Sequence, residues 1–498
     1  MPLRPTPVEH RLADVAERCA LTLSDPASAD LRVTGITLDS RSVQPGDIFA
    51  ALPGAHAHGA SFIPQARDLG AVAILTDSDG LASAAGLPAL LHADPRGRLG
   101  AVSALVYGDP ARDLLLVGVT GTNGKTTTAY LLQAGLRAAG LRAGLIGTTG
   151  VLMDGESVPS ARTTPEAPDL HALLGVMRER GVQAVAMEVS SHALVLGRVD
   201  GIVFDAAVFT NLSQDHLDFH GTMEAYFAAK ASLFVPERTR LAVIGVDDDW
   251  GRRLAVQAMV PVTTFAIHHH ADVRCVSIRP DAQGQALTVM AGPDRATVRL
   301  GIPGDFNAAN GLAAWTTLRA LGLPAHAADE GLADVRVPGR MEIVDVGQPF
   351  LAVVDYAHSP DSVERVISSL RPAPGGRCIV VLGCGGDRDR DKRPVMGRIA
   401  GSLADLLIVT DDNPRSEDPA AIRASMLTGV PAGADVREIG DRREAISAAV
   451  AAAREGDVLL LLGKGHEPGQ EAGGVVQPFH DVDALAYALS VAGEEQRG

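Results

Sequence analysis

The stretch that decides the fold is Val117-Gly-Val-Thr-Gly-Thr-Asn-Gly-Lys-Thr-Thr-Thr128. An apolar run over residues 114–117 leads into it, and a helical pattern follows it. This order predicts a strand, a glycine-rich phosphate loop and a helix, in which backbone N–H groups surround phosphate oxygens. Lys125 supplies positive charge for the terminal phosphates, and the Thr126 hydroxyl is placed to reach Mg²⁺. We therefore expect ATP to bind here.

The spacing of this loop departs from the common P-loop pattern. That pattern has a glycine five residues before the glycine of Gly-Lys-Thr, where this chain has Val119. Gly121, three residues before Gly124, is the glycine present, so the loop is a shortened variant. A turn rich in Gly and Thr with no ligand is the alternative, but the order of strand, Gly-Lys-Thr and helix favours nucleotide binding.

Bulk properties narrow the class of protein. A chain of 498 residues is too long for one core and suggests roughly three domains. The formal charge of −16, with dispersed basic residues, argues against a nucleic-acid surface. The first 30 residues carry charges throughout, and no apolar run is long enough to span a membrane. Four widely spaced cysteines indicate neither a disulfide framework nor a zinc site, so we expect a cytoplasmic protein.

The first part of the chain has the pattern of a small α/β domain. Short apolar runs over residues 33–38, 48–52, 71–76 and 88–92 alternate with helical stretches. Two polar loops follow the first two runs, Thr37-Leu-Asp-Ser-Arg41 and Gly54-Ala-His-Ala-His-Gly59. Either loop could contact a ligand, although exposed loops often hold such residues without any function.

Glu188 closes a buried type of strand over residues 182–187. An acidic residue at the end of a strand beside a phosphate loop is where a nucleotide-bound Mg²⁺ usually finds its carboxylate. The alternative is that Glu188 caps the next helix.

Lys230 lies in the apolar stripe of a predicted helix. The stripe also contains Met223, Tyr226, Phe227, Leu233 and Phe234, at spacings of three and four. Burial disfavours an ammonium group, so this lysine either pairs with a carboxylate or becomes a neutral amine able to react, for example with CO₂. Nearby, His216 and His220 could be core or ligand histidines, whereas residues 268–270 predict an exposed loop without a role.

The last third of the chain predicts an open parallel sheet. After linker-like Val337-Pro-Gly-Arg340, apolar runs at residues 351–354, 378–382, 406–409 and 458–462 each end in polar or glycine-rich residues. In a parallel sheet those ends share one edge, where ligands bind. The Gly383 loop has Arg388 where a dinucleotide fingerprint needs a third glycine, so NAD binding is not expected. Arg388 and Arg415 instead suggest recognition of a carboxylate, with a solvated basic loop as the alternative.

Together these stretches resemble the Mur ligase family, and within it the MurE type, over nearly the whole chain. The motifs that carry the resemblance are Gly121-Thr-Asn-Gly-Lys-Thr-Thr127, Glu188-Val-Ser-Ser-His192, Asp215-His216 with Ala229-Lys230, Gly339-Arg340, Asp355-Tyr-Ala-His358, Asp412-Asn-Pro-Arg415 and Gly463-Lys-Gly-His-Glu467. The resemblance implies an α/β protein of three domains. These are a UDP-precursor-binding domain (residues 1–110), a central P-loop ATPase-like domain (111–336) and a Rossmann-like amino-acid-binding domain (337–498).

The activity implied by the resemblance is that of an ATP-dependent, ADP-forming ligase of peptidoglycan synthesis. Such an enzyme phosphorylates a carboxylate of UDP-N-acetylmuramoyl-L-alanyl-D-glutamate, and an incoming amine, here meso-2,6-diaminopimelate, displaces the phosphate. Lys125 and Mg²⁺ would neutralise charge between the two anions while the domains close. One Mg²⁺ would use Thr126 and Glu188, and a second would use His216 and a Lys230 carbamylated by CO₂. The resemblance thus favours the reactive lysine over the ion pair.

The resemblance also assigns binding residues. Those for ATP are Gly121, Thr122, Asn123, Gly124, Lys125, Thr126, Thr127, Asn307, Arg340 and Asp355. Those for the UDP precursor are Leu38, Ser40, Ala55, His56, Ala57, Thr163, Thr164, Ser190 and Arg198. Those for diaminopimelate are Arg388, Asp412, Asn413, Pro414, Arg415, Gly463 and Glu467. Leu196 stands where many relatives have glutamine, so one hydrogen bond to the precursor is not expected.

Other functions remain open at this point. A lysine- or ornithine-adding ligase of the same type is one, and a folylpolyglutamate-synthase-like or MurF-like ligase is another. A P-loop ATPase or regulator that makes no covalent product is the alternative from a different class. Arg415 favours diaminopimelate over lysine, because a guanidinium can hold the extra carboxylate. We expect a monomer without nucleic-acid or membrane partners.

Overall fold

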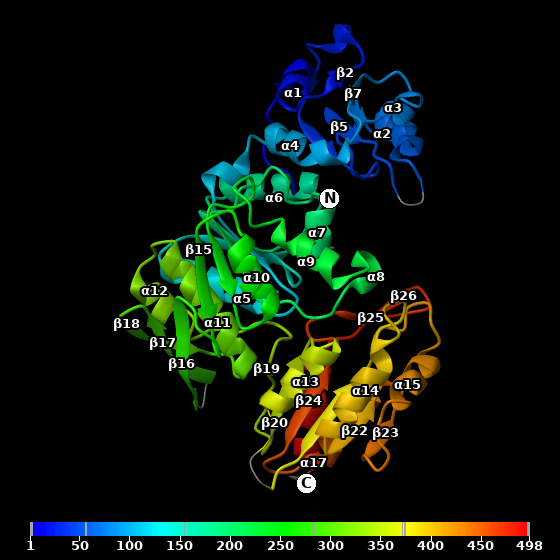
Figure 1. The fold of residues 1–498 in the computed structure, drawn as a ribbon. Helices are drawn as coiled ribbons and strands as arrows, with labels where there is room; N and C mark the ends of the chain where they lie inside the picture. Colours follow the sequence, from blue (N-terminus) through cyan, green and yellow to red (C-terminus); the bar gives the residue numbers. More distant parts are fainter. Residues whose placement is uncertain are drawn as a thin grey trace.

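The computed structural model describes residues 3–54, 57–153, 155–158, 160, 162–281, 284–370, 372 and 375–495. In this part of the chain three large sheets follow one another, with two smaller two-stranded sheets beside them, so the predicted α/β class is confirmed (Figure 1). Two of the site residues assigned from the sequence, Ala55 and His56, lie outside the described residues.

The first sheet has five short strands, and all but β2 run parallel. Their order is β2 (Thr22–Leu23), β7 (Ala89–Leu91), β6 (Ala73–Thr76), β5 (Asp47–Ala50) and β4 (Gly35–Thr37). The helices of this part are α1 (Leu12–Arg18), α2 (Ile63–Asp68), α3 (Ser78–Leu81) and α4 (Arg96–Val106). Each predicted apolar run overlaps a strand, although the strands are shorter than the runs and β5 begins one residue before its run, at Asp47. The reason is that apolar turn residues beside a strand are buried with it.

The second sheet has eleven strands. Their order is β11 (Glu156–Val158), β10 (Gly150–Met153), β9 (Ala143–Gly147), β12 (Ala184–Glu188), β8 (Leu115–Thr120), β13 (Ala206–Phe209), β14 (Ala242–Gly245), β15 (Val262–Ala266), β16 (Val273–Asp281), β17 (Gly284–Ala291) and β18 (Asp294–Leu300). From β9 to β16 the neighbouring strands are parallel, while β16, β17 and β18 form an antiparallel extension. The phosphate loop follows β8, which lies between β12 and β13 in the parallel part.

Helices cover both faces of the parallel part. Buried residues of α5 (Lys125–Ala138) and α11 (Asp305–Ala320) belong to one hydrophobic cluster, with α12 (Ala325–Asp329) beside them. A second cluster contains residues of α6 (Ala167–Glu179), α7 (Ser191–Val195), α9 (Met223–Ala231) and α10 (Asp249–Gln257). Burial from both sides explains why these strands are continuous apolar runs without alternation.

The third sheet has six strands, ordered β19 (Glu342–Ile343), β20 (Leu351–Asp355), β24 (Val458–Leu462), β21 (Cys378–Leu382), β22 (Leu406–Val409) and β23 (Val436–Glu438). Only β19 is antiparallel. One face carries α13 (Pro360–Ser369), α14 (Lys392–Leu403) and α15 (Pro419–Leu427), and the other carries α16 (Arg442–Ala452) and α17 (Asp481–Glu495). A hairpin of β25 (Gly469–Ala472) and β26 (Val475–Pro478) follows β24. The predicted open sheet with polar carboxyl ends is therefore present.

Candidate active site

A cavity of about 290 Å³ lies between the central and third sheets. Its walls come from the phosphate loop and the ends of the neighbouring central strands, from α9 and α11, and from the loop after β20 with the following helix α13. The residues assigned from the sequence that line it are Thr122, Asn123, Gly124, Lys125, Thr126, Thr127, Thr163, Glu188, Ser190, His216, Lys230, Arg340 and Asp355. The nucleotide, metal and catalytic assignments therefore meet at one place.

The backbone of the phosphate loop depends on glycine at two positions. Gly121 and Gly124 both have positive φ angles, of 144° and 86°. A Cβ atom on Gly124 would also lie 2.1 Å from Oδ1 of Asn310, which comes from α11. Helix α5 begins directly afterwards at Lys125. The loop thus presents a helix N-terminus toward the cavity, which favours a phosphate group.

Lys125 folds back over this loop. Its Nζ donates hydrogen bonds to the carbonyls of Gly121 and Thr122, at 3.1 and 2.8 Å. Burial lowers the pKa of Lys125, whereas the negative charges of Glu188 and Asp215 oppose that shift. A phosphate anion would add a further negative charge beside the ammonium, so it would be bound with a gain in electrostatic free energy.

Glu188 is a buried carboxylate held by neutral donors. It is 1% exposed and accepts hydrogen bonds from the Thr126 hydroxyl (3.0 Å) and from the Thr148 backbone N–H (2.8 Å) and hydroxyl (3.2 Å). Within the described residues no lysine or arginine nitrogen lies within 4.0 Å of it. The alternative that Glu188 caps the next helix is wrong, because Ser190 caps α7. Mg²⁺ prefers oxygen ligands. The Glu188 carboxylate, which has no cationic partner among the described residues, and the Thr126 hydroxyl are two adjacent oxygen groups, so they are suited to bind this ion.

Lys230 is 1% exposed and lies on α9. Its Nζ donates to the carbonyl of Gly121 at 2.7 Å and lies 4.6 Å from the centre of the Tyr226 ring. The open alternative of a structural ion pair is wrong, because no carboxylate of the described chain lies within 4.0 Å of Nζ. Burial, with the nearby charge of Lys125, moves the pKa of Lys230 well below its usual value. The side chain is therefore suited to exist as a neutral amine.

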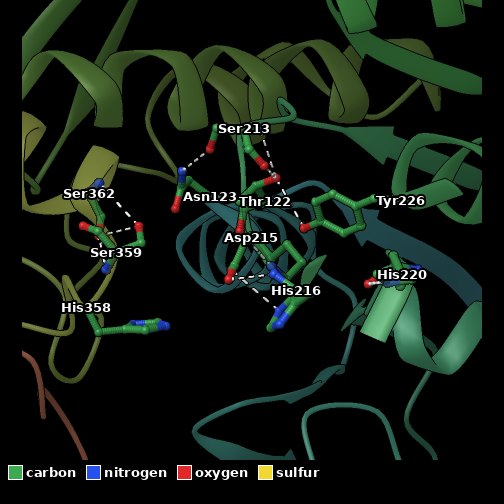
Figure 2. Close-up of polar contacts among 12 residues, drawn as sticks. Thr122, Asn123, Ser213, Asp215, His216, His220, Tyr226, His358, Ser359 and Ser362 are labelled. Carbon is green, nitrogen blue, oxygen red and sulfur yellow. Dashed lines mark hydrogen bonds and ion pairs between the residues drawn. The ribbon is translucent and has the colours of Figure 1, made fainter. Parts of the chain in front are cut away.

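His216 lies at the mouth of the cavity, just before the short helix α8 (Leu217–His220). Its backbone has a positive φ of 53°, and its side chain is 44% exposed. Its Nε2 lies 3.5 Å from Oδ2 of Asp215, and burial lowers its pKa. Figure 2 shows Asp215 and His216 opposite His358 and Ser359 of the third sheet. A neutral imidazole at this point is available as a ligand.

The third sheet closes the cavity with Arg340 and Asp355. Arg340 lies over the ring of Tyr356 at 4.2 Å, and its Nη2 is 3.5 Å from the Thr126 hydroxyl. Asp355 accepts hydrogen bonds from the backbone N–H groups of Met341 and Ala357, each at 2.8 Å, and burial raises the pKa of its carboxyl group. Both residues therefore line the cavity from the side of the third domain, and Arg340 reaches the phosphate loop.

Asn307 is buried just behind the cavity wall. Its amide nitrogen donates to the Pro303 carbonyl at 2.7 Å, and its Oδ1 accepts from Asn310 at 3.0 Å. Asn310, which the ATP assignments did not include, is the asparagine that lines the cavity.

A second group of polar residues gathers at the carboxyl ends of β22 and β24. The Asn413 amide donates to Oε2 of Glu467 at 2.7 Å, and Nη1 of Arg415 donates to the Gly386 carbonyl at 2.7 Å. A Cβ on Gly463 would lie 2.6 Å from Oδ2 of Asp412, which explains the glycine. Pro414 is buried within this loop. Arg388 is exposed, and its Nη1 donates to the carbonyl of its neighbour Asp387; among the described residues no hydrogen bond or ion pair joins it to the group.

The residues assigned to the UDP precursor fall in two places. Thr163 and Ser190 line the cavity, and Thr164 and Arg198 lie behind them, where Arg198 pairs with Glu166 at 2.9 Å. The others lie in the first domain: Ser40 donates to Gln65 at 2.7 Å, Leu38 is half-buried and Ala57 is exposed. In the described part of the chain no hydrogen bond or ion pair joins these two sets.

Besides Asn310, the site assignments from the sequence missed three residues. Thr148 orients Glu188, Asp361 accepts a hydrogen bond from Asn123, and Lys464 lies buried beside Glu467. Lys464 stands inside a quoted motif and could have been singled out, whereas nothing in the sequence points to Thr148 or Asp361.

Comparison with known proteins agrees with this geometry. Residues 32–104, 119–318 and 339–465 match three family models, described as Mur ligase family, catalytic domain, Mur ligase middle domain and Mur ligase, glutamate ligase domain. The chain is also 54% identical over 497 residues to a UDP-N-acetylmuramoyl-L-alanyl-D-glutamate--2,6-diaminopimelate ligase of Streptomyces avermitilis, covering 97% of this chain and 98% of the relative. The chain belongs to the Mur ligase family. A Corynebacterium glutamicum ligase of the same description is 49% identical, with 93% of both chains covered.

Solved Mur ligase structures have the same fold. A structure of a UDP-N-acetylmuramoyl-L-alanyl-D-glutamate--2,6-diaminopimelate ligase aligns with a TM-score of 0.70 at 31% identity, covering 98% of this chain and all of that one. A Thermotoga maritima MurF ligase in complex with ADP aligns at 0.65 and 20% identity, over 93% and 98% of the two chains, which shows the fold alone. Mur ligases generally use ATP and Mg²⁺. None of the helices described for this chain is both long and apolar enough for a membrane span. The expected cytoplasmic location and monomeric state stay predictions.

Proposed function

We propose that this chain joins meso-2,6-diaminopimelate to UDP-N-acetylmuramoyl-L-alanyl-D-glutamate, using ATP and passing through an acyl phosphate. The observation that carries the proposal is the meeting of the phosphate loop, the buried carboxylate of Glu188 and the buried amine of Lys230 in one cavity. The relatives named as diaminopimelate ligases, at 54% and 49% identity, support this substrate over the alternatives. The product would be a tripeptide precursor of peptidoglycan, released with ADP and phosphate.

The first requirement of such a reaction is to bring two anions together. Backbone N–H groups of residues 121–127 and the Lys125 ammonium would hold the triphosphate, and Arg340 would approach it from the third sheet. Thr126 and Glu188 fit one Mg²⁺, because they offer oxygen ligands beside the phosphate loop. Bound Mg²⁺ would neutralise charge between the phosphates and the precursor carboxylate. Asp355 also lines the cavity and would contact the nucleoside, while Asn310 lies against Gly124 of the phosphate loop.

Lys230 would serve this site as a carbamate. Its neutral amine can attack CO₂, forming an N–C bond and releasing one proton, so the buried side chain becomes an oxygen anion. That anion, with His216, would provide ligands for a second Mg²⁺. The buried position beside the phosphate loop supports this assignment, since an amine would otherwise only donate to the Gly121 carbonyl.

Each of the three domains would bind a different part of the substrates. Residues 1–110 would take the uridine end of the precursor through Leu38, Ser40 and the loop at residues 55–57. Thr163, Thr164, Ser190 and Arg198 would contact its sugar and peptide. Residues 337–498 would hold the amino acid, with Arg415 and Arg388 taking its carboxylates and Glu467 its ammonium group. Because the amino-acid residues do not line the cavity, the third domain would move to bring the amine to the acyl phosphate.

The test is phosphate release by the purified full chain with ATP and Mg²⁺. Sustained release is expected only when the UDP-dipeptide and diaminopimelate are both present, and a regulator or simple ATPase would not need either. Product mass from a mixture of diaminopimelate, lysine and ornithine then identifies the amino acid. Addition of lysine or ornithine alone would overturn the diaminopimelate assignment while keeping the ligase.

A further inference from the structure

Lysine is rare in this chain. Its 44 cationic side chains include only four lysines, which are Lys125, Lys230, Lys392 and Lys464. The first two line the cavity, and Lys392 donates at 2.9 Å to the carbonyl of His358, another cavity residue. Almost all other cationic side chains of this sequence are arginines. A lysine therefore indicates a position that needs a compact ammonium group and not a planar guanidinium group. Lys464 does not line this cavity, and the proposed function gives it no task.

Lys464 is completely buried and fully hydrogen-bonded. Its Nζ donates to Oδ1 of Asn413 at 3.1 Å, to Oε2 of Glu467 at 3.2 Å and to the carbonyl of Gly469 at 2.7 Å. An ammonium group has three donors, and all three are used. The acceptors come from three segments: the loop after β22, the loop after β24 and the first residue of β25. One side chain therefore joins three of the segments around the proposed amino-acid pocket.

These bonds determine which way the Asn413 amide points. Its Oδ1 accepts from Lys464 and from the backbone N–H of Glu471, at 2.9 Å, so its nitrogen must face Glu467. Oε2 of Glu467 then receives two donors. No described residue donates to Oε1 of Glu467, and this side chain is 29% exposed. The pocket is left with one available carboxylate oxygen on Glu467, which suits the ammonium group of an amino acid, while Arg415, whose Nε lies 3.5 Å from Oε2 of Glu471, could take a carboxylate.

We propose that Lys464 is a positioning residue for the amino-acid substrate. By holding Asn413 and one oxygen of Glu467, it directs the other oxygen toward the substrate ammonium group. The inference rests on the proposed function for the identity of that substrate. It requires the shape of an ammonium group as well as its charge, because a guanidinium cannot place three donors around a single atom.

The test compares Lys464→Met and Lys464→Arg in the full chain, with KM measured separately for diaminopimelate, ATP and the UDP-dipeptide. We expect both variants to raise the KM for diaminopimelate at least tenfold, while the other two KM values stay within twofold of wild type. The matched control is Arg377→Met. Arg377 pairs at 2.7 Å with Asp457, a 3% exposed carboxylate at the opposite ends of the same strands, so its loss should lower the melting temperature without changing any KM.

A double variant shows how much of any loss of stability comes from the charge of Glu467 left without its partner. Lys464→Met with Glu467→Gln removes that charge, so its melting temperature should return toward wild type; its KM for diaminopimelate does not decide the proposal, because Glu467 itself is assigned to the substrate ammonium group. If Lys464→Met does not fold, the KM values of Lys464→Arg decide. A KM for diaminopimelate within twofold of wild type in either folded single variant would overturn the proposal, as would an equal rise in all three KM values. If wild type itself releases no phosphate with any amino acid, the proposed function fails instead.

Discussion

The amide of Asn123 donates a 2.8 Å hydrogen bond to Oδ2 of Asp361 and so joins the phosphate loop to the first turn of α13. The Ser213 hydroxyl lies 3.4 Å from the same oxygen, and Arg365 pairs with the other oxygen at 2.9 Å. Figure 2 shows Asn123 and Ser213 side by side at this junction. The loop that would hold ATP is therefore bonded directly to the domain that would hold the amino acid. We therefore expect nucleotide binding to depend on the position of the third domain.

Replacing Asp361 tests that coupling. Asp361→Ala should weaken the closed arrangement by about 1 kcal/mol, the size of a partly exposed hydrogen bond, and lower kcat/KM for ATP roughly fivefold. Asp361→Asn keeps an acceptor for Asn123 and should stay closer to wild type. Steady-state kinetics measures both, and X-ray scattering should give a larger radius of gyration for the alanine variant. Equal kinetics for alanine and asparagine variants would show that the contact has no role.

Glu188→Gln tests the proposed Mg²⁺ carboxylate. The amide keeps an oxygen acceptor for Thr148 but removes the charge, so turnover should fall on the order of 100-fold. The free energy of unfolding should not decrease, because the buried carboxylate has no cationic partner to lose. Calorimetry of ATP binding with and without Mg²⁺ measures the effect, and the variant should lose most of the Mg²⁺ dependence. Normal Mg²⁺-dependent turnover would exclude the assignment.

Lys230→Ala should abolish turnover and be partly rescued by formate or acetate. The reason is that a small carboxylate can enter the vacated space and replace the carbamate oxygens. Wild-type activity should also fall in CO₂-depleted buffer and return with bicarbonate. Lys230→Met, which leaves no space, is the control and should not be rescued. Full activity of the alanine variant without additive would remove the carbamate from the proposal.

Arg415→Ala should raise the KM for diaminopimelate by roughly one to two orders of magnitude, corresponding to about 1–3 kcal/mol for a charge-assisted hydrogen bond. The KM for ATP should not change, because Arg415 does not line the cavity. Arg415→Lys keeps the positive charge but not the planar guanidinium group, so it should reverse only part of the rise in KM for diaminopimelate. An unchanged KM for diaminopimelate in a folded alanine variant would contradict the assignment.

The environment of His466 leads us to expect that the folded protein loses stability at acidic pH. The Nε2 atom of His466 lies 3.3 Å from the carbonyl of Thr148 in the central domain, and burial, followed by the charge of Arg340, lowers its pKa from 6.5 to about 4. The unfolded chain binds this proton at higher pH than the folded one does, so stability is lost as the pH falls from about 6.5 toward 4. Urea unfolding at pH 7 and pH 5 measures the loss, which His466→Gln should reduce. An identical pH dependence in the variant would count against it.

Much of this protein is determined by its sequence alone, because the information is local. The strand, loop and helix around Lys125 follow from glycine placement and apolar runs, and four of the third sheet's strands occur where the apolar runs predict them. Fully buried parallel strands must be continuous apolar runs, and such runs are visible in one dimension.

Only the tertiary structure decided how these pieces meet. The sequence left Lys230 open between an ion pair and a reactive amine, and the choice depended on which groups of distant segments surround it. In the same way, Thr148 beside Glu188, Asp361 beside Asn123 and the three acceptors of Lys464 are contacts between residues far apart along the chain. The physical reason is that local pattern governs backbone conformation, whereas burial and hydrogen-bond partners depend on how the sheets and helices pack.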